Sequence, residues 1–258
     1  KTLESVRRCR EIIVLDGGST DNTVTIAKEF GARVEPQRDP ARQGTQLTDF
    51  SEARNSALRH TTKPWILALD SDELASPELL AEMERVVQRE QPCACFVPRR
   101  YVLLDGTMIT HATTYPNARL YYFHRDTVER WIKPVHERPL LKPGTPIRHL
   151  RGWSLALLGS PEEFKRRNLH YLAIEVASAH PTWGMWLRRL IRAIRGRLIA
   201  LLKLAWIWLL PHRGTRLPLR HEWLRFWYTW RLVIETCPLR KDSKDTKEAK
   251  DSKEKSVF

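Results

Sequence analysis

The chain has 258 residues, enough for one domain of about 170 to 180 residues with further segments attached. Its 44 Lys and Arg outnumber its 30 Asp and Glu, and the resulting net charge of +14 predicts an anionic partner: a nucleic acid, an acidic membrane surface or a phosphorylated substrate. The four cysteines are scattered and form no paired CxxC motifs, which argues against a disulfide framework or a zinc site and favours a reducing cytosol. The first residue is Lys, so we expect the chain to begin inside a longer protein.

The first predicted elements form half of a nucleotide-binding unit. Residues 11–16 read as a buried strand that ends in Asp16, and a glycine turn with small polar residues follows over 17–23. Apolar residues then recur at helical spacing until Gly31, which is typical of a helix end. The same turn is also ordinary capping chemistry, with Thr20 or Asp21 as the cap.

The next elements predict an α/β fold. Residues 32–35 read as a short strand, residues 49–60 as a helix with Arg54 off its apolar stripe, and residues 65–69 as a strand buried on both faces. This alternation of strands and helices predicts a doubly wound, mostly parallel sheet.

Three carboxylates end the strand at 65–69. Asp70 and Asp72 are two residues apart, so they project to one side if the extended conformation continues, at the sheet edge where α/β proteins bind ligands. Two such acids suit a divalent cation with phosphate oxygens on it. The alternative is a solvated turn in which Asp72 or Ser76 caps the helix that starts at Pro77.

Further elements complete a first domain that we place at residues 1–180. We expect a helix over 77–91, strands at 95–97 and 101–104 with a hairpin turn at Asp105-Gly106, and a strand over 147–153. Ser160, followed by Pro161 and two acids, predicts the start of another helix.

Five segments together resemble a known enzyme family. In order, they are EIIVLDGGSTDNT (11–23), ARNSAL (53–58), WILALDSDE (65–73), NARLYYF (117–123) and VHE (135–137). They resemble the family 2 glycosyltransferases of GT-A fold, and within that family the branch of the lipopolysaccharide core β-glucosyltransferases. The resemblance covers about residues 5–175. It departs from the family at the start, where the usual first strand and its turn are missing, and at Gly17, where many members carry an acid.

The resemblance implies roles for several residues. Asp16 would lie by the nucleoside of a nucleotide sugar. Asp70 and Asp72 would be the outer acids of the Asp-any-Asp motif, with Asp72 holding Mg²⁺ or Mn²⁺ against the diphosphate and Asp70 nearer the ribose and the metal's water shell. A hard cation on oxygen ligands would stabilise the charge of the departing diphosphate.

Four further residues are candidates for the reaction itself. The resemblance makes Glu137 the base that takes the acceptor hydroxyl's proton, while the alternative is a surface pair with Arg138 or Arg130. His136 would ligate the metal or orient a phosphate, or else be structural. Arg54 would reach the diphosphate, unless it is a solvated helix charge, and Arg119 would line the acceptor side.

The segment after residue 180 is basic and aromatic. No acid occurs between Glu175 and Glu222, while Trp and Leu follow helical spacing over 183–202, with arginines on the other face. Residues 198–210 are too short an apolar run to cross a membrane. We therefore expect residues 181–239 to lie in an anionic membrane interface, as one helix followed by a second over 221–235. The alternative is a helical hairpin packed on protein.

Residues 240–258 are charge-balanced and of low complexity, which predicts a disordered tail. The combined expectation is a metal-dependent, inverting glycosyltransferase that moves a hexose from a nucleotide sugar, UDP-glucose, to a lipid-linked glycan such as lipopolysaccharide core. We place it peripherally at the cytoplasmic face of a bacterial inner membrane. The alternatives are transfer to a polyprenyl phosphate and a non-catalytic membrane-binding module; a nucleic-acid partner is not expected.

Overall fold

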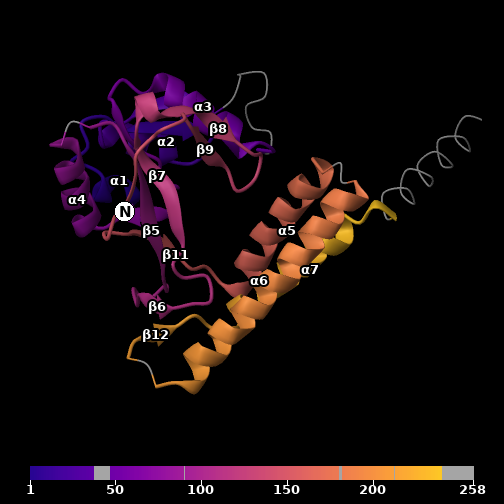
Figure 1. Ribbon diagram of the computed structural model, residues 1–258. Coiled ribbons are helices and arrows are strands. Elements are labelled where there is room, and N and C mark those ends of the chain that lie inside the picture. The colour runs from indigo at the N-terminus through magenta and orange to yellow at the C-terminus, as the bar shows by residue number, and fades with distance from the viewer. Residues whose placement is uncertain (38–46, 90, 180–181, 212, 240–258) are drawn as a thin grey trace, which may run out of the picture. The chain divides into compact units, whose positions relative to one another are not determined.

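A computed structural model describes residues 1–37, 47–89, 91–179, 182–211 and 213–239 (Figure 1). The chain forms two compact units. The first comprises Lys1–Ile109 and Tyr115–Leu158, and the second comprises Thr110–Thr114 and the described residues from Gly159 onward. The domain boundary that we place at residue 180 stays a prediction. The predicted tail at 240–258 lies outside the described residues.

The first unit alternates strands and helices in its first half and is rich in strands in its second. Its elements up to residue 87 are α1 (Thr2–Ser5), β1 (Ile13–Asp16), α2 (Thr23–Glu29), β2 (Arg33–Pro36), α3 (Phe50–His60), β3 (Trp65–Leu67), β4 (Glu73–Ala75) and α4 (Pro77–Val87). The later ones are β5 (Ala94–Val102), β7 (Ala118–His124), β8 (Val128–Ile132), β9 (Arg138–Leu141), β10 (Ile147–His149) and β11 (Ser154–Leu157). The predicted α/β class is confirmed.

The sheet of six strands is mixed, which corrects the expectation of a mostly parallel one. Strands β1 and β2 pair in parallel, as predicted. In the six-stranded sheet the order is β3-β7-β5-β11-β4, with β10 also beside β5. Strand β5 is parallel to β10 and β11, but β7 runs antiparallel to both β3 and β5, and β4 antiparallel to β11. The parallel prediction was wrong here because β5 and β7 are joined without a crossover helix.

The core lies between α4 and this sheet. Leu79 on α4, Cys93 and Phe123 are fully buried, and Trp65 of β3 stacks on Tyr122 with ring centroids 5.3 Å apart. Ser76 caps α4 by accepting a hydrogen bond from the Leu79 backbone N–H at 3.2 Å, so the capping alternative is correct for Ser76. This cap fixes the start of α4 directly after β4.

The second unit is helical, with α5 (Pro161–Ala177), α6 (Trp183–Leu209) and α7 (Leu219–Glu235). Helices α5 and α6 both pack against α7 (Figure 1). Ser160 and Glu163 form the predicted capping box at the start of α5. A short strand, β12 (Thr215–Arg216), pairs with β6 (Ile109–His111). Of the helices described, none combines the length and apolarity needed to cross a membrane.

Buried polar contacts hold the second unit together. The carboxylate of Glu222 on α7 is buried and accepts hydrogen bonds from the Thr113 backbone N–H at 2.8 Å and the Thr113 hydroxyl at 2.5 Å. Its neighbour His221 is also buried, and its Nε2 lies 3.1 Å from the carbonyl oxygen of Gly159. The indole of Trp186 on α6 donates to the Val233 carbonyl of α7 at 2.9 Å. The segment Thr110–Thr114 therefore belongs structurally with helices that are distant from it in the sequence.

Candidate active site

Arg54 stands at the centre of the candidate site. It lies on α3, whose first turn is capped by the Asp49 side chain accepting from the backbone N–H groups of Ser51 and Glu52. The guanidinium of Arg54 donates to a carboxylate oxygen of Asp70 and, through Nε at 3.3 Å, to Oε1 of Glu137. One cation thus joins the carboxylate after β3 to the one between β8 and β9.

Aromatic rings enclose this cation. The guanidinium carbon of Arg54 lies 5.4 Å from the ring centre of Tyr121 and 5.5 Å from that of Trp131, and its side chain is only 19% exposed. Burial opposes the charge, but Asp70, Tyr121 and Glu137 outweigh it, so the pKa of Arg54 lies above its ordinary value. The arginine stays charged in a place where water could not solvate it fully.

Asn55, the next residue on α3, fixes the strand that carries Trp131. Its side-chain amide donates to the Trp131 carbonyl at 3.0 Å and accepts from the Trp131 backbone N–H at 2.7 Å. We did not predict this residue or the two rings as part of the site. The signal in the sequence for Asn55 was the triplet ARN (53–55), in which Asn55 follows Arg54 and both lie outside the apolar stripe of the helix.

Asp70 is held by two arginines. Besides Arg54, it faces Arg119 on β7, with Nη1 3.7 Å from Oδ2, and Arg119 donates to the Tyr121 hydroxyl at 2.7 Å. Burial raises the pKa of Asp70, but Arg54, then Arg119, overcome this effect and hold it below its usual value. Both oxygens of Asp70 thus face guanidinium groups, which makes it a poor metal ligand in this arrangement.

Glu73, the last of the three acids, is turned inward. It opens β4, is fully buried and forms an ion pair with Arg99 of β5, Nε to Oε1 at 2.5 Å. Burial raises the pKa of Glu73 to about 7 despite that arginine. This pair links β4 to β5.

Glu137 and His136 lie in the connection between β8 and β9. That connection is tied to the start of α3 by the Phe50 backbone N–H, which donates to the Pro134 carbonyl at 2.9 Å. Glu137 is 12% exposed and pairs with Arg54, in place of the surface arginines that we considered. His136 is exposed and adopts a positive φ of 55°, so it marks the bend of the loop.

Asp16 closes the glycine turn after β1. Its carboxylate accepts from the backbone N–H groups of Gly18 at 3.0 Å and Ser19 at 3.2 Å. A side-chain hydrogen bond with Ser19 is the largest cause that lowers the pKa of Asp16. The structure therefore brings Arg54, Asp70, Arg119 and Glu137 together, whereas the side-chain hydrogen bonds described for Asp16 are those of its own turn.

Asp72 is the remaining acid of the three that follow β3, and it is exposed. Among the residues that the structure describes, no three His, Cys, Asp or Glu side chains gather in a group able to hold a metal ion. Mg²⁺ usually takes one or two carboxylates and fills its other positions with water and substrate phosphates. As an exposed acid, Asp72 fits that pattern, whereas both oxygens of Asp70 face guanidinium groups, so Asp70 as a metal ligand stays a prediction.

The sequence matches the glycosyl transferase family 2 profile over residues 1–139, just over half of the chain. The chain therefore belongs to glycosyl transferase family 2. The match includes every candidate residue named above, from Asp16 to Glu137.

Three curated relatives share this part of the chain. A TPR repeat-containing protein of Synechococcus elongatus is 34% identical over 128 residues, 49% of this chain and 28% of the relative. The lipopolysaccharide core biosynthesis glycosyltransferase LpsC of Rhizobium meliloti is 30% identical over 97 residues, 34% of either chain. The glycosyltransferase SunS of Bacillus subtilis is 38% identical over 89 residues, 34% of this chain and 20% of SunS. The chain thus spans between 20% and 34% of the lengths of these relatives.

Solved structures of S. aureus TarS resemble the whole chain more distantly. The complex of TarS with UDP has a TM-score of 0.43 at 13% identity, and the complex with UDP-GlcNAc has a TM-score of 0.42 at 14% identity. Each alignment covers 95% of this chain and 87% of the TarS chain.

Proposed function

We propose that this protein transfers a hexose from a nucleotide sugar, with UDP-glucose as the donor, to a hydroxyl of a lipid-linked glycan such as lipopolysaccharide core. The observation that carries the proposal is the Arg54–Asp70–Glu137 cluster in a chain of glycosyl transferase family 2. Similarity to LpsC supports the choice of acceptor. We propose the cytoplasmic face of the inner membrane as its location, where nucleotide sugars and a lipid-linked acceptor would meet.

In the proposed reaction the acceptor hydroxyl attacks the anomeric carbon from the face opposite the diphosphate, which inverts that carbon. The new carbon–oxygen bond forms as the bond to the diphosphate breaks, and the nucleoside diphosphate leaves with the bonding electrons. Glu137 takes the proton of the attacking hydroxyl. Arg54 keeps Glu137 oriented through its Nε–H, and Arg119 lines the acceptor side.

Negative charge on the departing diphosphate needs a positive counterpart. We propose that Asp72 holds Mg²⁺ or Mn²⁺, which supplies that charge when it is bound. His136, exposed one residue before Glu137, is a proposed accessory group for the metal or a phosphate. Asp16 is proposed to contact the nucleoside.

Replacement of the proposed base tests the chemistry. With UDP-glucose and a lipopolysaccharide core acceptor, Glu137→Gln should lower kcat by about 100-fold or more, because the amide cannot accept the proton. Glu129→Gln is the matched control, since Glu129 is an exposed acid on β8. A loss within a few-fold for Glu137→Gln would remove the base assignment and favour a polyprenyl phosphate as acceptor, since that anion needs no base.

Nucleotide binding tests the metal assignment and catalysis separately. Titration of UDP in the presence of Mn²⁺ should show at least about tenfold weaker binding for Asp72→Ala than for the wild type, and no such loss for the exposed control Asp126→Ala. Equal affinities in all three proteins would contradict a metal-bridged nucleotide at Asp72. If the wild type neither binds UDP nor hydrolyses a sugar nucleotide, the chain is a non-catalytic module.

A further inference from the structure

Helix α6 uses only one face for packing within the second unit. Its buried residues are Ala193, Ala200 and Ile207, which recur every seven positions and so form a single stripe. Trp186 extends that stripe and bonds to α7. Small alanines in the middle of this stripe lie between larger side chains at its two ends, Trp186 and Ile207.

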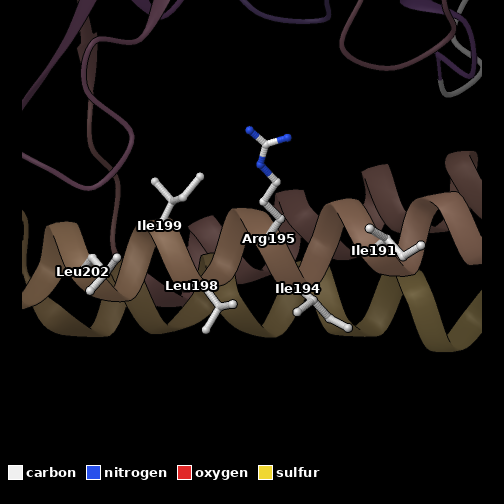
Figure 2. A pocket seen from close by; sticks show the side chains of 6 residues that line it. All are labelled: Ile191, Ile194, Arg195, Leu198, Ile199 and Leu202. Atoms are coloured by element: carbon white, nitrogen blue, oxygen red, sulfur yellow. The ribbon is translucent and has the colours of Figure 1, made fainter.

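A second apolar stripe on α6 faces solvent. Its members follow one another at intervals of three, four or seven residues, and all are exposed: Leu187, Ile191, Ile194, Leu198, Leu202 and Leu209. Leu198 is 57% exposed and Leu202 73%. Ile191, Ile194, Leu198 and Leu202 line a shallow groove with Arg195 and Ile199 (Figure 2). A stripe of this length on the surface marks an interaction site.

Positive charge borders this stripe. Arg188, Arg192 and Arg195 are exposed on α6, and Figure 2 shows Arg195 directed away from Leu198 and Ile194. No acid lies between Glu175 and Glu222 in the sequence, so nothing on α6 itself neutralises them. Trp183 and Trp206, near opposite ends of the helix, are 55% and 64% exposed. Apolar residues bordered by arginines, with tryptophans near the ends, suit the boundary between lipid headgroups and acyl chains.

We propose that this exposed stripe of α6 docks the protein on an anionic phospholipid surface, with the helix lying in the plane of the interface and its arginines at the lipid phosphates. A second copy of the chain fits less well, because two such faces placed together would bring arginines against arginines. The choice of a lipid partner draws support from the lipid-linked acceptor in the proposed function, but binding to lipid does not require any transfer activity.

Vesicle flotation with the full chain tests this proposal. Vesicles of phosphatidylethanolamine and phosphatidylglycerol should carry the wild type, whereas vesicles of phosphatidylcholine alone should carry at least about tenfold less. The double substitution of Leu198 and Leu202 by Glu should lower binding to the anionic vesicles at least about tenfold, because it places carboxylates on the apolar stripe. Leu104→Glu is the matched control, since Leu104 is 77% exposed in a turn of the first unit.

A second variant isolates the charge. Changing Arg188, Arg192 and Arg195 to Gln leaves the apolar stripe intact and should abolish the preference for anionic vesicles. Equal changes at the exposed residues Lys28, Lys63 and Arg85 should not. Thermal unfolding of each variant shows whether the helical unit is intact, and the Gln variant still decides the question if the Glu variant fails to fold.

Three outcomes would overturn the proposal: unchanged flotation of the Leu198/Leu202 variant, equal binding to neutral and anionic vesicles, or dimerisation in light scattering without vesicle binding. Failure of the proposed function is distinguishable. A protein that floats with vesicles but transfers no sugar retains this docking face, and one that glycosylates a detergent-solubilised acceptor without floating does not use it.

Discussion

One arginine of the first unit and three of the second stand in opposite surroundings. In the first, Arg54 is surrounded by two carboxylates and two aromatic rings and is mostly hidden from water. In the second, Arg188, Arg192 and Arg195 follow one another along an exposed helix in a segment without acids. The comparison teaches that an arginine enclosed by opposite charges is a coupled part of the fold, whereas exposed arginines without acidic neighbours on their helix remain available for the docking that we propose.

The sharpest way to break this comparison is to remove a carboxylate from the first unit. Asp70→Asn leaves the Arg54 charge with Glu137 alone, and we expect kcat/KM to fall by about 100-fold or more and the free energy of unfolding by about 1–3 kcal/mol. Steady-state kinetics and urea denaturation measure the two effects. The contrasting variant Arg192→Met, in the second unit, should change the free energy of unfolding by less than about 0.5 kcal/mol. Equal destabilisation by the two variants would refute the distinction.

The next largest effect is expected at Glu222, a buried acid of the helical unit. Glu222→Ala removes the acceptor for both hydrogen bonds from Thr113 and leaves these donors buried, so the free energy of unfolding should drop by about 2–3 kcal/mol. Glu162→Ala, at an exposed acid on α5, serves as the control. A loss no greater than in the control would show that Thr113 finds water instead.

A smaller effect should separate positioning from charge within the first unit. Asn55→Ala keeps every charge of the site but frees Trp131 from its two hydrogen bonds, which should cost about 1–2 kcal/mol of stability and lower kcat less than Asp70→Asn does. Asn22→Ala, at a helix start where the side chain makes no capping bond, is the comparison. If Asn55→Ala were as inactive as Asp70→Asn, Asn55 would take part in the reaction itself.

The smallest expected effect is a dependence of the second unit on pH. Burial lowers the pKa of His221, so the folded protein holds it neutral at pH values where the unfolded chain already binds a proton. Stability should therefore be present above about pH 6.5 and decline as the pH falls below it. The drop in thermal midpoint between about pH 7.5 and about pH 5 should be larger for the wild type than for His221→Gln. Equal drops would show that His221 does not titrate on unfolding.

Local patterns were sufficient to predict most helices of the fold. The helices at 23–29, 50–60, 77–87, 161–177 and 219–235 follow from apolar spacing and from the capping residues Ser76 and Ser160. The strands β7, β8 and β9 were not predicted, because charged and apolar residues mix along them. Strand β7 pairs with β3 and β5, whereas β8 and β9 pair with each other. We expected two strands around Pro98, but β5 continues through it.

The candidate site was predictable as a set of residues but not as a set of contacts. Motifs singled out Arg54, Asp70 and Glu137. In the fold, however, Arg54 pairs with Asp70, which is 16 residues away in the sequence, and with Glu137, which is 83 residues away, and no local pattern predicts which carboxylates an arginine will pair with. The structure shows Arg54 bonded to both acids, and its expected contact with the diphosphate stays a prediction. Tyr121 and Trp131 were missed for the same reason, since their rings meet Arg54 only in the folded chain.

The course of the chain through the second unit limits how that unit can be exchanged. Residues 110–114 leave the first unit between β5 and β7, join the helices through Glu222, and return. A hybrid enzyme made by fusing a new C-terminal half after residue 158 would keep this loop but lose its carboxylate partner. An exchange of the helical unit between related transferases therefore has to include both residues 110–114 and the helices from residue 159 onward, taken from the same protein.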